Sequence, residues 1–319
     1  MNLFELVAVI NFPIILGWIF KHLKLFPDRD VAVLRRFVIK VSVPFLIFRN
    51  LYNADVSEFG QMLPSVTSLV LILVLTTVFV YLIRRLSSDD PLVSNSFCIG
   101  SFVGNYSYLG WGVLFYFYGE SGFTRGVFFS MFFWPVVLMT GFTMIYFLSG
   151  RPADKSSRGK ILSALRSNAL PPVVSALSAM VLNYAGVKIP LWLTKSIESL
   201  AGITIPSILF TVGLSFSLIA DKKMVKPVAL GTLVRTILGI MIGIIAVAVV
   251  SVLFPGVDTT TKKVVLMESV MPTAATSPLF ADFIDSDKEV ISGIITASTL
   301  FALVTLPLWY TLIERWSWL

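Results

Sequence analysis

Apolar stretches of about twenty residues, separated by clusters of charge, limit most strongly how this chain can fold. A helix of that length spans the hydrocarbon core of a bilayer. Hydrophobic residues make up 56% of the chain and charged residues only 13%, an apolar excess too large for ordinary soluble cores. The sequence therefore predicts an all-α polytopic membrane protein, and it disfavours soluble, disordered and nucleic-acid-binding classes. We place ten transmembrane helices at 3–20, 31–51, 62–83, 93–118, 124–149, 161–184, 190–218, 226–254, 262–284 and 290–313.

Lysine and arginine are distributed unequally over the loops between these spans. Sixteen of them fall in or near the loops that follow the odd-numbered spans, and seven fall in or near the loops and ends on the opposite side. Loops rich in Lys and Arg remain in the cytoplasm. We therefore expect a multi-pass plasma (inner) membrane protein whose two termini are extracellular or periplasmic. The formal net charge of +7 is then mostly a topology signal, and it requires no nucleic-acid partner.

The two halves of the sequence can be aligned with each other by matching their prolines. Residues 41–48 (VSVPFLIF) match residues 203–210 (ITIPSILF) at an offset of 162, and six proline pairs fall at offsets between 158 and 172. We expect a first five-helix repeat in 1–150, a short cytoplasmic linker in 151–160 and a second five-helix repeat in 161–319. Because five is odd, the second repeat enters the membrane inverted. Inverted repeats are typical of secondary transporters, which bind substrate near the midplane where the repeats meet.

The fourth and ninth predicted spans carry helix-breaking residues at corresponding positions. Residues 100–112 (GSFVGNYSYLGWG) contain four glycines, and residues 268–278 (ESVMPTAATSP) contain two prolines. Unwound backbone within a membrane is tolerated only where protein or a water-filled cavity satisfies it, and its freed amides suit a carboxylate. Glycines such as Gly100 and Gly104 could instead serve close helix packing. The predicted substrate site comprises Gly104, Asn105, Tyr106, Ser107, Met271, Pro272 and Thr273.

We single out three of the ionisable residues inside predicted spans, where such residues are functional candidates by default. Glu268 could hold a coupling proton, bind a cation or pair with a base. Lys40 could attract an anion, or its long stem could carry the charge to the interface. Arg235 has the same two options as Lys40, or it could form a structural pair with Glu268 or Glu198.

Other polar residues add little chemistry to this picture. Asn11 and Ser42 are candidates for lining the cavity, with hydrogen bonds between helices as the alternative. The single histidine and the single cysteine provide neither a metal site nor a catalytic constellation. We therefore expect no enzyme and no cofactor beyond a coupling H⁺ or Na⁺.

Several motifs in the expected order resemble the auxin efflux carrier family. They are LRRFVIKVSVPFLIF (34–48), GNYSYLG (104–110) followed by YGESG (118–122), IPSILFTVGLSF (205–216), ESVMPTAATSPLFADFIDSD (268–287) and STLFALVTLPLW (298–309). The chain departs from the family pattern at Tyr106, Ser107 and Trp111, where aromatic bulk and a hydroxyl replace the usual small residues.

This resemblance implies a fold similar to that of the bile-acid/sodium symporters and NhaA, with broken helices 4 and 9 crossing. It also implies a scaffold domain and a transport domain, each built from both repeats, that move as an elevator. The short central loop is similar to that of bacterial members, which are associated with malate, malonate and other organic anions.

The leading hypothesis is therefore a secondary carrier for a small mono- or dicarboxylate. The alternative is a channel or membrane sensor built on the same fold. The motifs specify neither the substrate, the direction of transport, the coupling ion nor a choice between monomer and homodimer.

Overall fold

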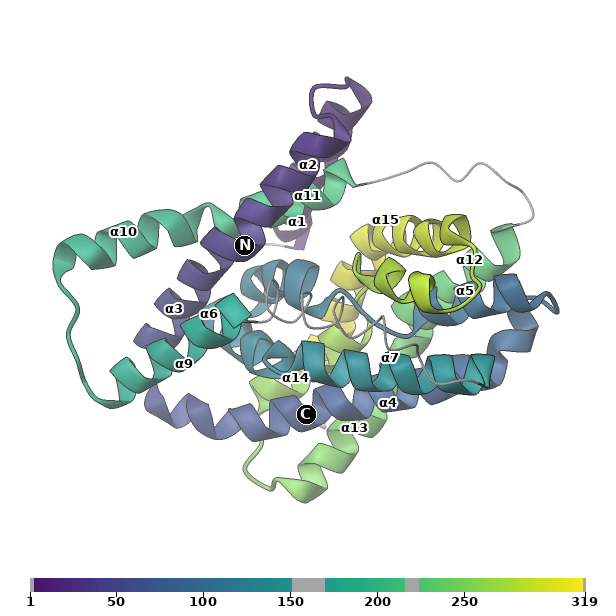
Figure 1. Cartoon of the computed structure of the whole chain (residues 1–319). Coiled ribbons are helices and arrows are strands. Elements are labelled where there is room, and N and C mark those ends of the chain that lie inside the picture. Colours follow the sequence, from purple (N-terminus) through teal and green to yellow (C-terminus); the bar gives the residue numbers. More distant parts are fainter. Residues whose placement is uncertain (1–2, 151–169, 216–223, 318–319) are drawn as a thin grey trace. The chain divides into compact units, whose positions relative to one another are not determined.

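The computed structural model describes residues 3–150, 170–215 and 224–317 (Figure 1). Within these residues the secondary structure is helical, and strand-like pairing is limited to one isolated antiparallel bridge between Gly104 and Thr273. The expectation of an all-α protein is confirmed. The predicted linker at 151–160 lies outside the described residues.

The chain divides into two compact units, and each unit takes segments from both halves of the sequence. The first unit comprises Met1–Leu63, Ser107–Met131 and Gly159–Phe216, and the second comprises Pro64–Tyr106, Phe132–Arg158 and Ser217–Leu319. The break at 102–105 in the fourth predicted span therefore falls at the end of a second-unit segment, directly before the chain enters the first unit.

The first unit is built on two close helix pairs. Helix α1 packs along α11, and α3 packs against α9 and α10. Within α6 the direction changes at Gly119, whose φ of 67° and ψ of −156° are accessible to glycine. This change of direction coincides with the predicted boundary between the fourth and fifth spans. The helices of this unit are α1 (Leu3–His22), α2 (Asp28–Phe37), the π turn η1 (Val38–Ser42), α3 (Val43–Asn53), the 3₁₀ turn η2 (Val56–Gln61), α6 (Trp111–Ser130), α9 (Leu170–Tyr184), α10 (Leu191–Gly202) and α11 (Thr204–Leu214).

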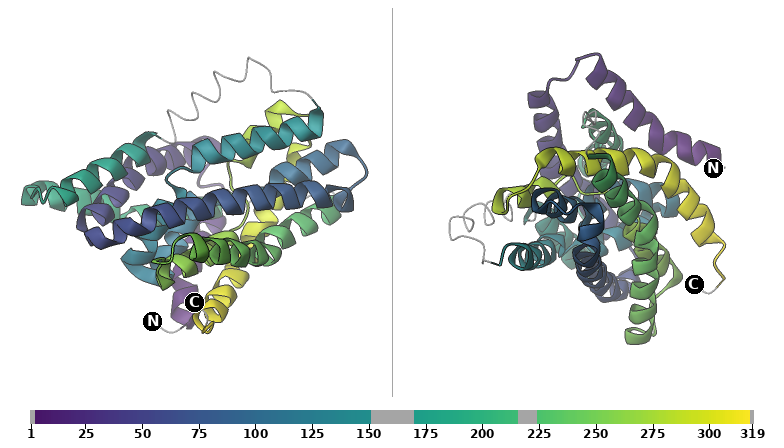
Figure 2. Two further views of the ribbon diagram at one scale, coloured as in Figure 1. Left: turned by 90° about the horizontal axis from the view of Figure 1, so that it is seen from below. Right: turned by 90° about the vertical axis from the view of Figure 1, so that its right-hand side faces the viewer.

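The second unit contains the two interrupted helices. Helix α15 packs against α5 and α12, and α13 packs along α14, while α4 runs unbroken for 26 residues (Figure 2). The elements of this unit are α4 (Met62–Ser87), α5 (Pro91–Ser101), α7 (Phe133–Ser149), α12 (Val225–Leu233), the π turn η6 (Val234–Leu238), α13 (Gly239–Leu253), α14 (Thr259–Ser269), the 3₁₀ turn η7 (Ser277–Phe283) and α15 (Lys288–Glu314). The π turn η3 (Tyr106–Gly110) begins at the last residue of one second-unit segment.

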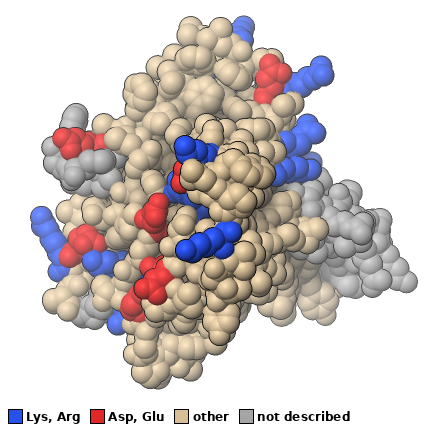
Figure 3. Space-filling model, turned by 90° about the vertical axis from the view of Figure 1, so that its left-hand side faces the viewer, with Lys and Arg blue, Asp and Glu red and all other residues tan. Residues whose placement is uncertain are grey.

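Several helices have the length and composition of membrane spans. Among the described residues these are Val56–Ser87, Leu191–Leu214, Val225–Leu253 and Lys288–Glu314. A fifth is added if Tyr106–Ser130 and Phe133–Ser149, which are bent by 46°, form one span. On the face shown in Figure 3, charged side chains gather in several groups with uncharged surface between them. These helices agree with a multi-pass membrane protein.

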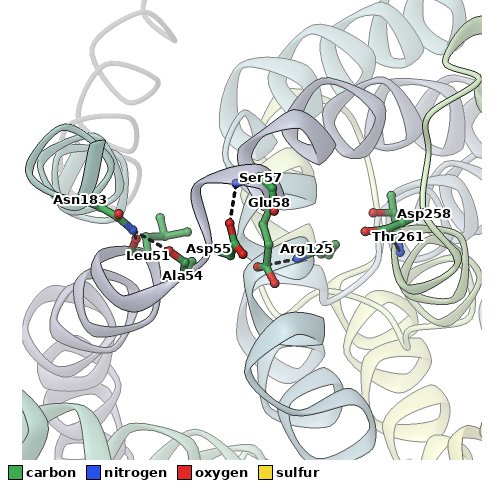
Figure 4. Close-up of polar contacts among 9 residues, drawn as sticks. All are labelled: Leu51, Ala54, Asp55, Ser57, Glu58, Arg125, Asn183, Asp258 and Thr261. Atoms are coloured by element: carbon green, nitrogen blue, oxygen red, sulfur yellow. Dashed lines mark hydrogen bonds and ion pairs between the residues drawn. The ribbon is translucent and has the colours of Figure 1, made fainter. Parts of the chain in front are cut away.

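Polar contacts fasten the end of α3 in the first unit (Figure 4). Asn183 Nδ2 on α9 donates to the carbonyl oxygens of Leu51 and Ala54, each at 2.8 Å. Asp55 Oδ1 accepts from the backbone N–H of Ser57 at 2.9 Å, and hydrogen bonds from Ser57 lower the pKa of this exposed carboxyl. The connection between α3 and η2 is therefore fixed by Asn183 at the end of α3 and by Asp55 at the start of η2.

The Glu58–Arg125 ion pair gives a test of this part of the fold. An Nη1 to Oε2 distance of 2.5 Å joins Glu58, 21% exposed, to the buried Arg125. Loss of one partner from a buried ion pair costs about 3–5 kcal/mol, and we expect Glu58→Gln to lower the free energy of unfolding by about 3 kcal/mol. Glu120 pairs with Arg49 at 3.2 Å but is 66% exposed, so Glu120→Gln should cost less than about 1 kcal/mol. Denaturant titrations of the purified variants measure both changes, and equal effects would contradict the prediction.

Candidate functional site

Both predicted helix interruptions are present in the second unit. Helix α5 ends at Ser101, and residues 102–105 are not helical before η3 begins. Helix α14 ends at Ser269, and residues 270–276 are not helical before η7 begins. The glycines of the first segment and the prolines of the second weaken helix continuation by about 1 and about 3 kcal/mol per residue. Local sequence therefore accounts for where both helices stop.

The two interrupted segments pair with each other through their backbones. Asn105 N–H donates to the carbonyl oxygen of Pro272 at 2.7 Å, and Ala274 N–H donates to that of Val103 at 3.0 Å. These two bonds flank the bridge between Gly104 and Thr273. Backbone groups freed by the breaks would be costly in a membrane interior without partners. Each segment thus supplies hydrogen bonds that the other has lost, and we call this pairing the crossing.

Thr273 ties the crossing to two neighbouring helices. Its Oγ1 donates to the carbonyl oxygen of Gly100 at 2.7 Å, and its backbone N–H donates to Ser298 Oγ at 3.1 Å. Carbonyl groups in the last turn of a helix have no partner within that helix. Thr273 therefore completes the end of α5 and fixes the crossing against α15.

Arg235 brings a positive charge to the crossing. The residue is fully buried in η6, and its Nε and Nη2 donate to the carbonyl oxygen of Met271 at 3.2 and 2.9 Å. Its Nη2 also donates to Tyr106 OH at 3.3 Å, and the guanidinium carbon lies 5.7 Å from the centre of the Tyr106 ring. Gly104 makes room for this approach, because a Cβ there would lie 2.3 Å from Nη2. The guanidinium is thus held by both interrupted segments.

Glu268 lies next to this cluster, in the last turn of α14. The side chain is fully buried, and neither carboxyl oxygen has a hydrogen-bond partner among the described residues. The charge of Arg235 acts on Glu268, but the hydrogen bonds of Arg235 go to Met271 and Tyr106 instead. The other proposed partner, Glu198, is an exposed residue of the first unit. Among the described residues, Arg235 and Glu268 therefore form no hydrogen-bonded pair.

The second unit brings together most of the residues predicted from sequence. Hydrogen bonds or direct backbone pairing at the crossing involve Gly104, Asn105, Tyr106, Arg235, Met271, Pro272 and Thr273, and Glu268 adjoins them. The side chain of Asn105 is buried at this place. These predicted site residues therefore lie together, and Gly104 allows the close approach of Arg235.

Four further candidates belong to the first unit. Ser42 is buried, and its hydroxyl donates to the carbonyl oxygen of Val38 in the same helix at 3.2 Å. The Lys40 side chain is exposed, whereas Asn11 and Ser107 are partly buried. The bond made by Ser42 agrees with a structural role inside its own helix.

The structure also shows polar contacts that the sequence analysis did not anticipate. Ser298 was not singled out, although a hydroxyl in an apolar span was a usable signal. In the first unit, Tyr108 OH shares a hydrogen bond with Thr211 Oγ1. Arg35 Nη2 donates at 2.6 Å to the hydroxyl of Ser215, the residue that follows α11. Across the described ranges, we find no group of three His, Cys, Asp or Glu residues arranged to hold a metal ion.

The chain is similar in sequence to known membrane transport proteins. A family model described as membrane transport protein matches residues 2–310. An uncharacterized transporter of Methanothermobacter thermautotrophicus is 27% identical over 308 residues, covering 96% of each chain. A second uncharacterized transporter, from Methanocaldococcus jannaschii, is 25% identical over 315 residues, covering 96% of this chain and 97% of that protein.

Proposed function

We propose that this chain, which belongs to the membrane transport protein family of the auxin efflux carriers, is a secondary carrier for a small organic anion. The family assignment makes it a transporter rather than an enzyme. The observation that favours an anion is the buried guanidinium of Arg235 at the crossing. Charge-assisted hydrogen bonds to a guanidinium are strong, and they suit a carboxylate. The substrate class we assign is a mono- or dicarboxylate.

In this proposal the substrate binds at the crossing of the second unit. One carboxylate oxygen accepts from the side-chain amide of Asn105, which stands directly after Gly104 in the paired segment. Half-helix ends and unwound backbone at matching positions are the usual elements of a transporter site. Met271, Pro272 and Thr273 supply the opposite wall.

The proposed architecture is ten transmembrane helices in two inverted repeats. In the alignment of the repeats, the first and second spans correspond to the sixth and seventh. The two close pairs of the first unit, α1 with α11 and α3 with α9, are then equivalent pairs: span 1 with span 7, and span 6 with span 2. Such equivalence is expected if a two-fold axis relates the repeats, and it supports this arrangement.

The mechanism we propose is an elevator. The second unit, which holds the crossing, acts as the transport domain, and the first acts as the scaffold. Each unit draws on both halves of the chain, as domains built from both repeats would. The protein would lie in the plasma membrane with both termini outside, since Lys and Arg favour that orientation.

Replacing Asn105 tests the proposed site. In thermal-shift titrations with acetate, malonate, malate and citrate, we expect Asn105→Ala to weaken binding of the best anion by about ten- to hundredfold, since a hydrogen bond to a charged group contributes about 1.5–3 kcal/mol. The matched control is Asn53→Ala, an exposed residue that donates to the carbonyl oxygen of Arg49 in its own helix. Unchanged affinity in a folded Asn105→Ala protein would remove this residue from the site.

A channel or membrane sensor on the same fold is the alternative. Single-channel recordings in planar bilayers discriminate the two, because a carrier gives no unitary conductance steps. Saturable uptake of a labelled anion without such steps is the expected result.

A further inference from the structure

The protonation state of Glu268 follows from its surroundings. The carboxyl group is fully buried, and both oxygens lack a hydrogen-bond partner among the described residues. An ionised carboxylate in such a place loses its hydration without compensation, which costs several kcal/mol in real proteins. The neutral acid avoids that cost. The arrangement seen here therefore suits Glu268 carrying a proton.

Among the described residues, Arg235 is the charged group that acts on Glu268. Helix α13, which packs along α14, carries no ionisable side chain. The charged residues of α15 and of α14 itself lie toward their ends, and Lys263 Nζ pairs with Glu314 at 2.9 Å. The other ionisable side chains of these two helices are those of Lys262, Lys288, Glu289 and Tyr310.

Arg235 has one guanidinium nitrogen that donates no hydrogen bond to the described residues. Its Nε and Nη2 are engaged with Met271 and Tyr106, but its Nη1 has no partner among the described residues. With Glu268 neutral, the cluster carries one uncompensated positive charge in a buried place. An anion and an ionised Glu268 are therefore alternative partners for the same guanidinium.

We propose that Glu268 and the transported anion compete for Arg235, so that one proton on Glu268 accompanies each anion. This inference rests on the proposed carrier function. In the loaded state the anion pairs with Arg235 while Glu268 is the neutral acid. On release, the O–H bond of Glu268 breaks, its proton passes to water on the release side, and the new carboxylate takes the place of the anion at Arg235. With a monocarboxylate both states are neutral overall, and with a dicarboxylate the loaded state carries only the charge of the second carboxylate.

Proton coupling predicts how anion binding depends on pH. Because binding requires protonated Glu268, affinity falls as pH rises, by up to about tenfold for each unit once the free protein has lost that proton. Isothermal titrations of the purified full-length protein with malonate and malate, at pH 5.5 to 8.5 in half-unit steps, measure this slope. Repeating the titrations in buffers of different ionisation enthalpy gives the number of protons taken up with each anion, from the change in the observed binding enthalpy.

Glu268→Gln keeps a neutral side chain of similar shape. We expect it to bind the anion with an affinity that no longer varies with pH, and to lose the stimulation of uptake by an inward proton gradient in proteoliposomes. Glu289→Gln, an exposed residue in the first turn of α15, is the matched control and should behave as wild type. In infrared spectra of the anion-loaded protein, a protonated-carboxyl band should be present in wild type and Glu289→Gln but absent from Glu268→Gln.

The outcomes separate this inference from the carrier proposal. Anion binding that is independent of pH in the wild type, or an infrared band unchanged by Glu268→Gln, overturns proton coupling and leaves the carrier proposal standing. Binding that requires Na⁺ and is lost in Glu268→Gln overturns it in favour of a cation site. Absence of binding by every anion in the panel at every pH overturns the carrier proposal and the inference together.

Discussion

Gly213→Ala is expected to destabilise the first unit by about 3 kcal/mol or more, which is the upper end of the cost of overpacking. A Cβ at this position would lie 1.9 Å from the carbonyl oxygen of Ile14, on α1. The contact is reciprocal, because a Cβ at Gly17 would lie 2.1 Å from the carbonyl oxygen of Phe210. Small residues allow such close approach of helices in membranes. Backbone oxygens cannot rotate away, so α1 and α11 must separate.

Gly202→Ala is the matched control for this effect. It lies at the end of α10 in the same predicted span, and a Cβ there meets no atom within 4 Å. Thermal unfolding and gel-filtration profiles in detergent compare the two variants. We expect a broad or aggregated profile for Gly213→Ala and a wild-type profile for Gly202→Ala. A Gly213→Ala protein as stable as wild type would mean that α1 and α11 are not held in this contact.

Local sequence was sufficient to locate the helix breaks. Glycines near Asn105 and prolines at 272 and 278 disfavour helix irrespective of what surrounds them, so the non-helical residues 102–105 and 270–276 fall within the two predicted segments. The matching positions of the two segments also indicated that they act together. Their pairing through Gly104 and Thr273 follows that expectation.

The partners of the buried polar side chains could not be derived in the same way. Arg235 reaches the carbonyl oxygen of Met271, 36 positions along the chain, because a π turn at Val234–Leu238 and the glycine at 104 set the geometry. Neither the turn nor the space beside Gly104 has a periodic signature in the sequence. A carboxylate was therefore the natural partner to consider, whereas the structure uses a backbone carbonyl left without a helical partner.

Polar residues of the second span show the same limit. Ser42 and Lys40 were candidates because they lie in an apolar segment beside Pro44. Once the π turn at Val38–Ser42 forms, the Ser42 hydroxyl bonds to the carbonyl oxygen of Val38, and Lys40 is exposed. Residue type and span position identify candidates, but side-chain direction depends on local departures from α-helical geometry.

Gly104→Ala is expected to abolish or greatly weaken anion binding while leaving the protein folded. A Cβ at this position would lie 2.3 Å from Arg235 Nη2 and 2.4 Å from Cε1 of Tyr106. These are side-chain atoms, and the end of the arginine can move, unlike the backbone oxygen that opposes Gly213. The guanidinium would therefore leave the Met271 carbonyl, and the charge at the crossing would be displaced. A displacement of about 1 Å at a binding centre is enough to cost a large factor in activity.

Gly112→Ala supplies the matched comparison for that variant. Its Cβ would lie 3.5 Å from Ile205 Cγ2 and Leu209 Cδ2, which is ordinary contact, and alanine favours helix. We expect Gly112→Ala to retain wild-type anion affinity, and Gly104→Ala to lose at least about tenfold, or 1.4 kcal/mol, with both thermal midpoints near that of wild type. Anion affinity retained by Gly104→Ala would show that binding does not depend on where Arg235 is held. Unfolding of Gly104→Ala would instead show that the close contact at Gly104 is needed for the stability of the fold, because the crossing could not accommodate one added methyl group.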